Sequence, residues 1–176
     1  MFYYYQFHFE GKITTTTSTT TSTTTSTTTT TTTTTTNNVV DCETGWTPHS
    51  KKCYRLFPAP LSWTSASAQC KANSGHLASV PDRETEDFLV GLAKNFSGST
   101  CLGPLELGSL WLGGYREGCE WQWNDGSPWN YTNWAKGEPN NAKGNEHHLE
   151  LWWAPPLWND EHGQSRHGYI CQKGGE

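Results

Sequence analysis

Short apolar runs separated by turn residues occupy the chain from residue 41 to its end. Two of them have the three- and four-residue spacing of an amphipathic helix: one follows Ser62, a suitable N-cap residue, and the other follows Pro81. Asn95 is expected at or beyond the end of the second helix. Shorter runs predict strands at residues 54–57, 110–113, 121–123, 149–152, 157–159 and 169–171.

Prolines and one long polar loop set the limits of these strands. Pro58 and Pro60 should end the first strand, because proline cannot donate a hydrogen bond to a sheet. Residues 127–144 are rich in Asn, Gly, Pro and Trp and predict a long irregular loop, and loops of that length usually carry function. Two helices followed by several short strands indicate an α+β domain.

The chain before this domain has a different composition. Residues 14–36 contain only Thr and Ser, so they have no apolar surface to offset the entropy of ordering. They predict a linker or an O-glycosylated stalk, or else an artefact of low-complexity coding sequence. Residues 1–13 are aromatic but lack the basic start and the cleavage site of a signal peptide, and they stay unassigned. Residues 41–176 suffice for one domain.

Charge and hydropathy argue against two classes of partner. The formal net charge is −5 and the pI is about 5.8, without a cluster of Lys and Arg, so nucleic acid is not an expected partner. No apolar run approaches the roughly 18 residues that a membrane helix needs, so membrane insertion is not expected either.

Six cysteines indicate an extracellular protein. They stand at Cys42, Cys53, Cys70, Cys101, Cys119 and Cys171. An even set without Cys-x-x-Cys spacing favours disulfides over structural zinc, although about 15 pairings remain open. Glycosylation sequons at Asn95 and Asn130 agree with secretion, whereas the missing export signal does not.

No arrangement of side chains predicts catalysis. The chain has neither a Gly-x-Ser-x-Gly elbow nor a His-Glu-x-x-His helix, so an enzyme is not expected. The histidines that would suit zinc are His147, His148, His162 and His167. We interpret them instead as partly exposed surface residues.

A set of oxygen-bearing side chains begins in the long loop and continues beyond it. Its members are Glu138, Asn140, Glu146, Asn159 and Asp160. Three are carboxylates and two are amides, and calcium prefers about 6–8 oxygen ligands of this kind. Any one of these residues alone would be an ordinary solvated polar side chain, but together they predict a calcium site.

A series of short motifs runs through the domain in a fixed order. They are Cys42…Gly45-Trp46…Cys53-Tyr54, Trp63…Ala68-Gln69-Cys70, Trp111-Leu112-Gly113-Gly114, Trp121-Gln122-Trp123-Asn124-Asp125-Gly126-Ser127-Pro128, Tyr131-Thr132-Asn133-Trp134, Gly137-Glu138-Pro139-Asn140-Asn141, Trp158-Asn159-Asp160 and Tyr169-Ile170-Cys171. In this order they resemble the C-type lectin-like domain over residues 41–173. The resemblance implies two helices, short antiparallel sheets and a long calcium-binding loop.

The resemblance also implies how the cysteines pair. The implied pairs are Cys42–Cys53, Cys70–Cys171 and Cys101–Cys119. A further bridge that the family usually has would fall at His148 and Gly163, where both cysteines are absent. The long loop is therefore expected to be less constrained, with bound calcium replacing part of the constraint.

The family's sugar-binding calcium site maps onto the five oxygen-bearing residues, which would hold both the ion and two adjacent sugar hydroxyls. The order Glu138-Pro139-Asn140, with Pro139 in the cis form, accompanies mannose-, N-acetylglucosamine- or fucose-type ligands in the family. A second family calcium site should be lost, because Asn141 and His147 stand where some members have carboxylates and Glu117 alone remains. We therefore expect one calcium ion.

The resemblance predicts a secreted, calcium-dependent lectin for mannose-type glycans that recognises cell or microbial surfaces. Several copies would be needed for useful affinity, so an oligomer is expected. The alternative from another class is the same fold used for protein–protein adhesion, with calcium structural or absent.

Overall fold

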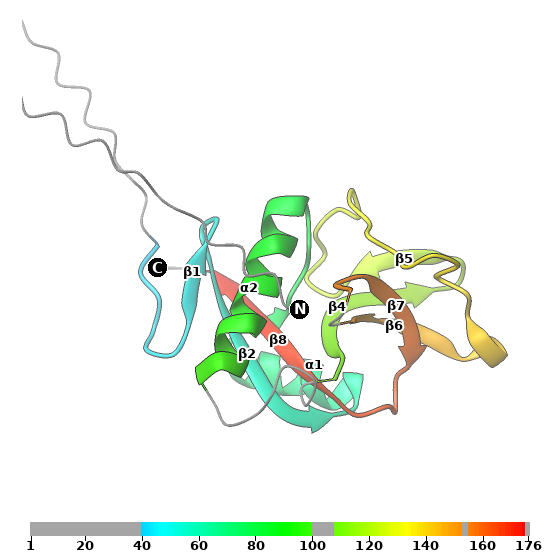
Figure 1. Cartoon of the computed structure of the whole chain (residues 1–176), viewed down its shortest axis with the longest axis horizontal. Helices are drawn as coiled ribbons and strands as arrows, with labels where there is room; N and C mark the ends of the chain where they lie inside the picture. Colours follow the sequence, from blue (N-terminus) through cyan, green and yellow to red (C-terminus); the bar gives the residue numbers. More distant parts are fainter. Residues whose placement is uncertain (1–39, 100–107, 153–154, 175–176) are drawn as a thin grey trace, which may run out of the picture. The chain divides into compact units, whose positions relative to one another are not determined.

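A computed structural model describes residues 40–99, 108–152 and 155–174 (Figure 1). Its helices are α1 (Trp63–Ala72), α2 (Arg83–Ser99) and the short 3-10 helix η1 (Ala142–Gly144). Its strands are β1 (Thr47–His49), β2 (Lys52–Leu61), β3 (His76–Leu77), β4 (Leu110–Glu117), β5 (Glu120–Trp123), β6 (Glu146–Leu151), β7 (Trp158–His162) and β8 (His167–Gly174). The α+β prediction is confirmed, while the predictions for residues 1–13 and 14–36 lie outside the described residues.

The strands form one sheet in the order β1-β2-β8-β4-β6-β7, with β3 added to β8 and β5 to β4. Neighbouring strands are antiparallel except β4 and β8, which are parallel. The last strand therefore lies between the first half of the domain and the strands that follow α2, as Figure 1 shows for β8 in red. No helix in the described ranges is long and apolar enough to cross a membrane.

Aromatic rings of the long loop pack around Trp158 at the start of β7. Trp158 is fully buried, and the ring centroids of Trp129, Tyr131 and Trp134 lie 5.6–5.7 Å from it. Trp123 of β5 contacts it from another side. Because the loop is fixed to Trp158, its polar residues lie close to the two residues that follow Trp158 on β7.

Helix α1 starts as the sequence predicts, since the Ser62 side chain accepts a hydrogen bond from Ser65 N at 3.3 Å. Helix α2 is longer than predicted, because it runs to Ser99 and includes Asn95. The expectation that Asn95 lies at or beyond the helix end is therefore wrong. The buried face continues through Ala93, and no Pro interrupts the helix, which accommodates Gly91 in its interior.

The prediction that Pro58 and Pro60 end the first strand is also wrong, because β2 continues to Leu61. The reason is a break in register: Phe57 pairs with Tyr169 and Leu61 with His167, so the residues between have no partner on β8. Proline at such an irregularity removes no hydrogen bond from the ladder.

Two of the three predicted disulfides are present. Cys42–Cys53 closes the β1–β2 hairpin, and Cys70–Cys171 ties α1 to β8. Cys101 lies outside the described residues, and Cys119 is an exposed free thiol in this structure. The pairing of Cys101 with Cys119 stays a prediction.

Candidate functional site

Asp160 on β7 is the point at which the long loop meets the sheet. Its carboxylate is completely buried and accepts hydrogen bonds from Asn140 N at 2.9 Å and from Asn141 N at 2.7 Å. One side chain therefore holds two successive backbone amides of the loop. This contact brings the loop residues of the predicted calcium site onto the strand residue of that site.

Glu138 lies in the same cluster. The Glu138–Pro139 peptide bond is cis, as the resemblance implies, and the Glu138 carboxylate accepts a hydrogen bond from Asn140 N at 3.1 Å. Burial raises the pKa of Glu138 above its ordinary value, and the neighbouring carboxyl group of Asp160 raises it further. Two acidic groups thus share one site, with Glu138 partly exposed and Asn140 exposed to solvent.

Glu146, the first residue of β6, closes the loop from its other end. Its carboxylate accepts a hydrogen bond from Ala142 N at 2.9 Å, and its own backbone N–H donates to Asn141 Oδ1 at 3.1 Å. Asn141 has a φ of 48°, a left-handed conformation that asparagine tolerates better than most residues. Four of the five predicted residues are therefore linked through a single hydrogen-bonded turn.

Asn159, the fifth predicted residue, is held differently. Its side-chain amide donates to Glu150 Oε1 at 2.9 Å, and Trp152 Nε1 donates to the same oxygen at 2.8 Å. Glu150 was missed at the level of sequence. The available signal was its position between two apolar residues of a strand, where a charged side chain is buried and needs partners.

Among the residues that the structure describes, no cationic side chain pairs with the carboxylates of Glu138, Glu146 and Asp160. In the described part of the chain the ion pairs are Lys52–Asp125, Arg83–Asp87, Lys173–Glu43 and His167–Glu150. Glu138 and Asp160 interact directly, and Glu146 is linked to them through the hydrogen bonds of the loop backbone and of Asn141. This donor set of carboxylate and amide oxygens fits a hard divalent cation such as calcium.

A buried glutamate of α2 anchors the middle of the long loop. Glu86 accepts hydrogen bonds from the hydroxyl group of Tyr131 and from Asn133 Nδ2, the latter at 2.9 Å. Burial, together with the contact with Glu86, raises the pKa of Tyr131 to about 12. The sequence motif containing Tyr131 and Asn133 was recognised, but nothing in the sequence showed that Glu86 binds it.

The two positions of the absent family bridge face each other. A Cβ atom placed on Gly163 would lie 2.6 Å from Cε1 and Nδ1 of His148, so the imidazole fills the space beside this glycine. The ring centroid of His148 also lies 4.6 Å from that of Trp63. Burial, together with the nearby His147 and His162, lowers the pKa of His148 to about 4.

Comparison with known proteins places these features in a wider context. The family model described as the Lectin C-type domain matches residues 59–173. The chain is 33% identical over 135 residues to the galactose-specific lectin nattectin of Thalassophryne nattereri, which covers 75% of this chain and 80% of that protein. It is 33% identical over 141 residues to a C-type lectin mannose-binding isoform of Oxyuranus scutellatus, and this alignment covers 77% of this chain and 85% of that protein.

A solved structure agrees with the sequence comparisons. The C-type carbohydrate-recognition domain of cow CD23, determined in the presence of a GlcNAc2Man3 oligosaccharide, aligns with a TM-score of 0.65 at 29% identity, over 78% of this chain and 98% of that one. The two sequence relatives above are equally similar to this chain and are named for different sugars. Overall similarity therefore does not choose the ligand, and the choice depends on the residues of the site.

Proposed function

The chain belongs to the C-type lectin domain family, whose members are non-enzymatic carbohydrate-binding proteins, and from this premise we propose that it is a calcium-dependent lectin for mannose-type glycans. Membership of this family agrees with the prediction from the sequence that the chain is not an enzyme. The finer points, calcium dependence and the class of sugar, rest on the residues of the candidate site.

The observation that carries calcium dependence is the hydrogen-bonded turn that links the carboxylates of Glu138, Glu146 and Asp160, none of which has a cationic partner among the described residues. Residues that would hold the ion are Glu138, Asn140, Glu146, Asn159 and Asp160. Bound calcium would supply a positive centre on which two neighbouring sugar hydroxyls complete the coordination. Because all the donors are oxygens, the set favours calcium over softer metals that prefer nitrogen or sulfur.

The class of sugar follows from the order of acid and amide along the loop. A carboxylate at Glu138 can only accept hydrogen bonds, whereas the amide at Asn140 can also donate them. Each sugar hydroxyl can then be held by the ion, by an acceptor and by a donor. Exchanging acid and amide would reverse the pattern that the hydroxyls meet, and in the family the reversed order accompanies galactose-type ligands.

A glycan array with and without EDTA tests the proposal. The protein should bind mannose-, N-acetylglucosamine- or fucose-type glycans only when calcium is present. The double substitution Glu138→Gln with Asn140→Asp should weaken these signals and favour galactose-type glycans, while Glu120→Gln, an exposed charge change on β5, should leave the profile unaltered. Binding that survives EDTA, or a profile that the double substitution leaves unchanged, would contradict the proposal and favour the protein-adhesion alternative.

The setting that we propose is extracellular. Two disulfides in the described residues support it, because disulfides persist in oxidising compartments. A single shallow sugar site is expected to bind a monosaccharide with a Kd of about 1 mM. Useful binding to a cell or microbial surface would then come from several copies acting together.

A further inference from the structure

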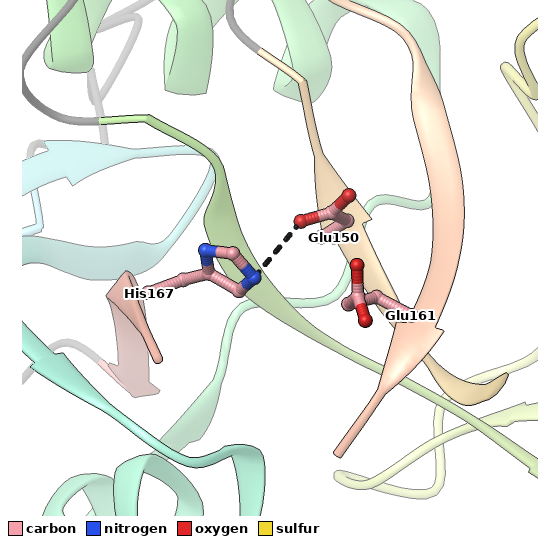
Figure 2. Close-up of side chains that lie close together, drawn as sticks. All are labelled: Glu150, Glu161 and His167. Atoms are coloured by element: carbon pink, nitrogen blue, oxygen red, sulfur yellow. Dashed lines mark ion pairs between the residues drawn. The ribbon is translucent and has the colours of Figure 1, made fainter. Parts of the chain in front are cut away.

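We propose that Glu150, Glu161 and His167 form a second metal site, for a divalent metal of the zinc type, that is separate from the calcium residues. The three side chains come from β6, β7 and β8, and Figure 2 shows them converging. One ligand atom from each residue lies within 4.8 Å of the others. Strands β6 and β7 are neighbours, and β4 lies between β6 and β8, so the sheet brings together three side chains that neither the sequence motifs nor the proposed lectin function uses.

Glu150 is already oriented as a metal ligand would be. Its Oε1 atom accepts hydrogen bonds from Trp152 Nε1 and Asn159 Nδ2, and its Oε2 atom faces His167 Nε2 at 3.2 Å. The side chain is only 4% exposed, and no Lys or Arg pairs with it in the described ranges. Hydrogen bonds of this kind fix a carboxylate so that one oxygen stays available for an ion.

The positions of Glu150 Oε2 and His167 Nε2 suit two ligands of one metal ion better than the acceptor and donor of a hydrogen bond. Their separation would suit a hydrogen bond, yet the buried His167 Nε2 has no hydrogen-bond partner among the described residues. The two atoms therefore lie side by side instead of along an N–H direction. Two ligands on a tetrahedral zinc ion, each at about 2.0–2.1 Å, lie about 3.3 Å apart, close to the spacing between these two atoms.

Glu161 would supply the third ligand. Both hydrogen bonds that the structure gives its carboxylate fall on Oε1, from His162 N at 2.7 Å and Ser165 Oγ at 2.9 Å. The residue is partly exposed, so its side chain has room to move. Its ligand oxygen lies at most 4.8 Å from the other two ligand atoms, whereas ligands of one tetrahedral zinc ion lie about 3.3 Å apart. A movement of roughly 1.5 Å at most is therefore required, and a change of side-chain torsion provides it.

The mixed donor set determines the kind of metal. One imidazole nitrogen with two carboxylate oxygens suits zinc and similar transition metals, whereas calcium prefers oxygen alone. Two carboxylates also balance the charge of a divalent ion. Three protein ligands leave one tetrahedral position for water.

The site lies directly behind a predicted calcium residue, because Glu150 holds the amide of Asn159. It shares no ligand with the calcium set, so calcium should not compete for it. The two proposals can therefore fail independently: zinc uptake tests this one whether or not the chain binds calcium or sugar.

Titration calorimetry of the full chain with zinc chloride, in saturating calcium and again without calcium, tests the site. One zinc ion should bind, and Glu161→Gln and His167→Gln should each weaken binding tenfold or more. The matched controls Glu120→Gln and His76→Gln should leave it unchanged. Cobalt in place of zinc should give the visible absorption of a tetrahedral nitrogen–oxygen site in the parent protein but not in His167→Gln.

Three results would overturn the site. They are no zinc uptake, zinc uptake that the two substitutions leave unchanged, and uptake that calcium abolishes. The first would leave Glu150 and His167 as a structural ion pair, and the last would place zinc on the calcium residues. If His167→Gln fails to fold, Glu161→Gln decides, since its side chain is partly exposed and its loss should leave the fold intact.

Discussion

At the scale of single residues, His148 has taken the place of a covalent bridge. The family resemblance places the absent cysteines at His148 and Gly163. The His148 ring packs against Gly163 and against Trp63. Because the glycine has no side chain, the imidazole occupies the space that a Cβ atom of residue 163 would need. The volume of the bridge is thus filled, but its restriction of the unfolded chain is lost.

Restoring the bridge should stabilise the protein. The positions are 15 residues apart, and closing a loop of that length contributes about 3 kcal/mol by the chain-entropy estimate. Urea unfolding of His148→Cys with Gly163→Cys should show a higher midpoint than the parent under oxidising conditions and lose this gain with reductant. Each single cysteine variant is the control. A double variant that forms the bridge but gains no stability would contradict the interpretation.

His148 should also make stability depend on pH. Its pKa is about 4 in the folded protein and about 6.5 in the unfolded chain, so between these values the unfolded chain binds more protons. The His148 contribution should therefore fall as pH decreases from about 6.5 to 4, by about 1–2 kcal/mol after allowing for the partly exposed ring. Unfolding of His148→Leu, compared with the parent at both ends of this range, isolates the effect. Parallel pH profiles would refute it.

At the scale of elements, apolar periodicity located both helices and most strands. Where a helix or strand ends was decided by its contacts with other elements. Proline predicts the end of a strand only if its position requires a hydrogen bond, and the register break in β2 removes that requirement. In the same way, the buried face of α2 extends the helix past Asn95. Such boundaries depend on contacts between distant residues, which one sequence does not reveal.

The anchor between α2 and the long loop should matter for the site. Removing the Glu86 carboxylate with Glu86→Ala leaves Tyr131 and Asn133 without their shared partner, and an unsatisfied buried polar group costs about 1–3 kcal/mol. We expect lower stability and faster amide exchange in residues 127–144. Glu84→Gln, on the exposed first turn of the same helix, is the control. Unaltered exchange in the loop would show that Trp158 packing alone holds it.

At the scale of the whole molecule, the motifs identified the family and nominated the candidate calcium residues. They did not identify Glu150 or Glu86, and they left His167 interpreted as a surface residue, because each acts through contacts across the sheet or between helix and loop. A motif records local order along the chain, whereas these three residues matter through neighbours far away in sequence. For this reason the proposed zinc-type site emerges only when β6, β7 and β8 are assembled around β4 in one sheet.

Calcium should stabilise the whole domain if it binds only the folded state. At a calcium concentration about 100 times its Kd the gain is about 2.7 kcal/mol, which raises the melting temperature over that in EDTA. The gain should shrink on acidification, because the raised pKa of Glu138 lets a proton compete with calcium at a higher pH than for an ordinary glutamate.

Melting curves with calcium, magnesium or EDTA, recorded at neutral and mildly acidic pH, measure this gain. Magnesium should substitute poorly, because it demands a smaller and more regular coordination shell. Glu138→Ala should abolish the calcium effect, while Glu120→Gln should retain it. Since the domain lacks one bridge and no cationic side chain of the described residues pairs with Glu138, Glu146 or Asp160, equal melting temperatures with and without calcium would mean that hydrogen bonds to backbone amides alone satisfy these carboxylates.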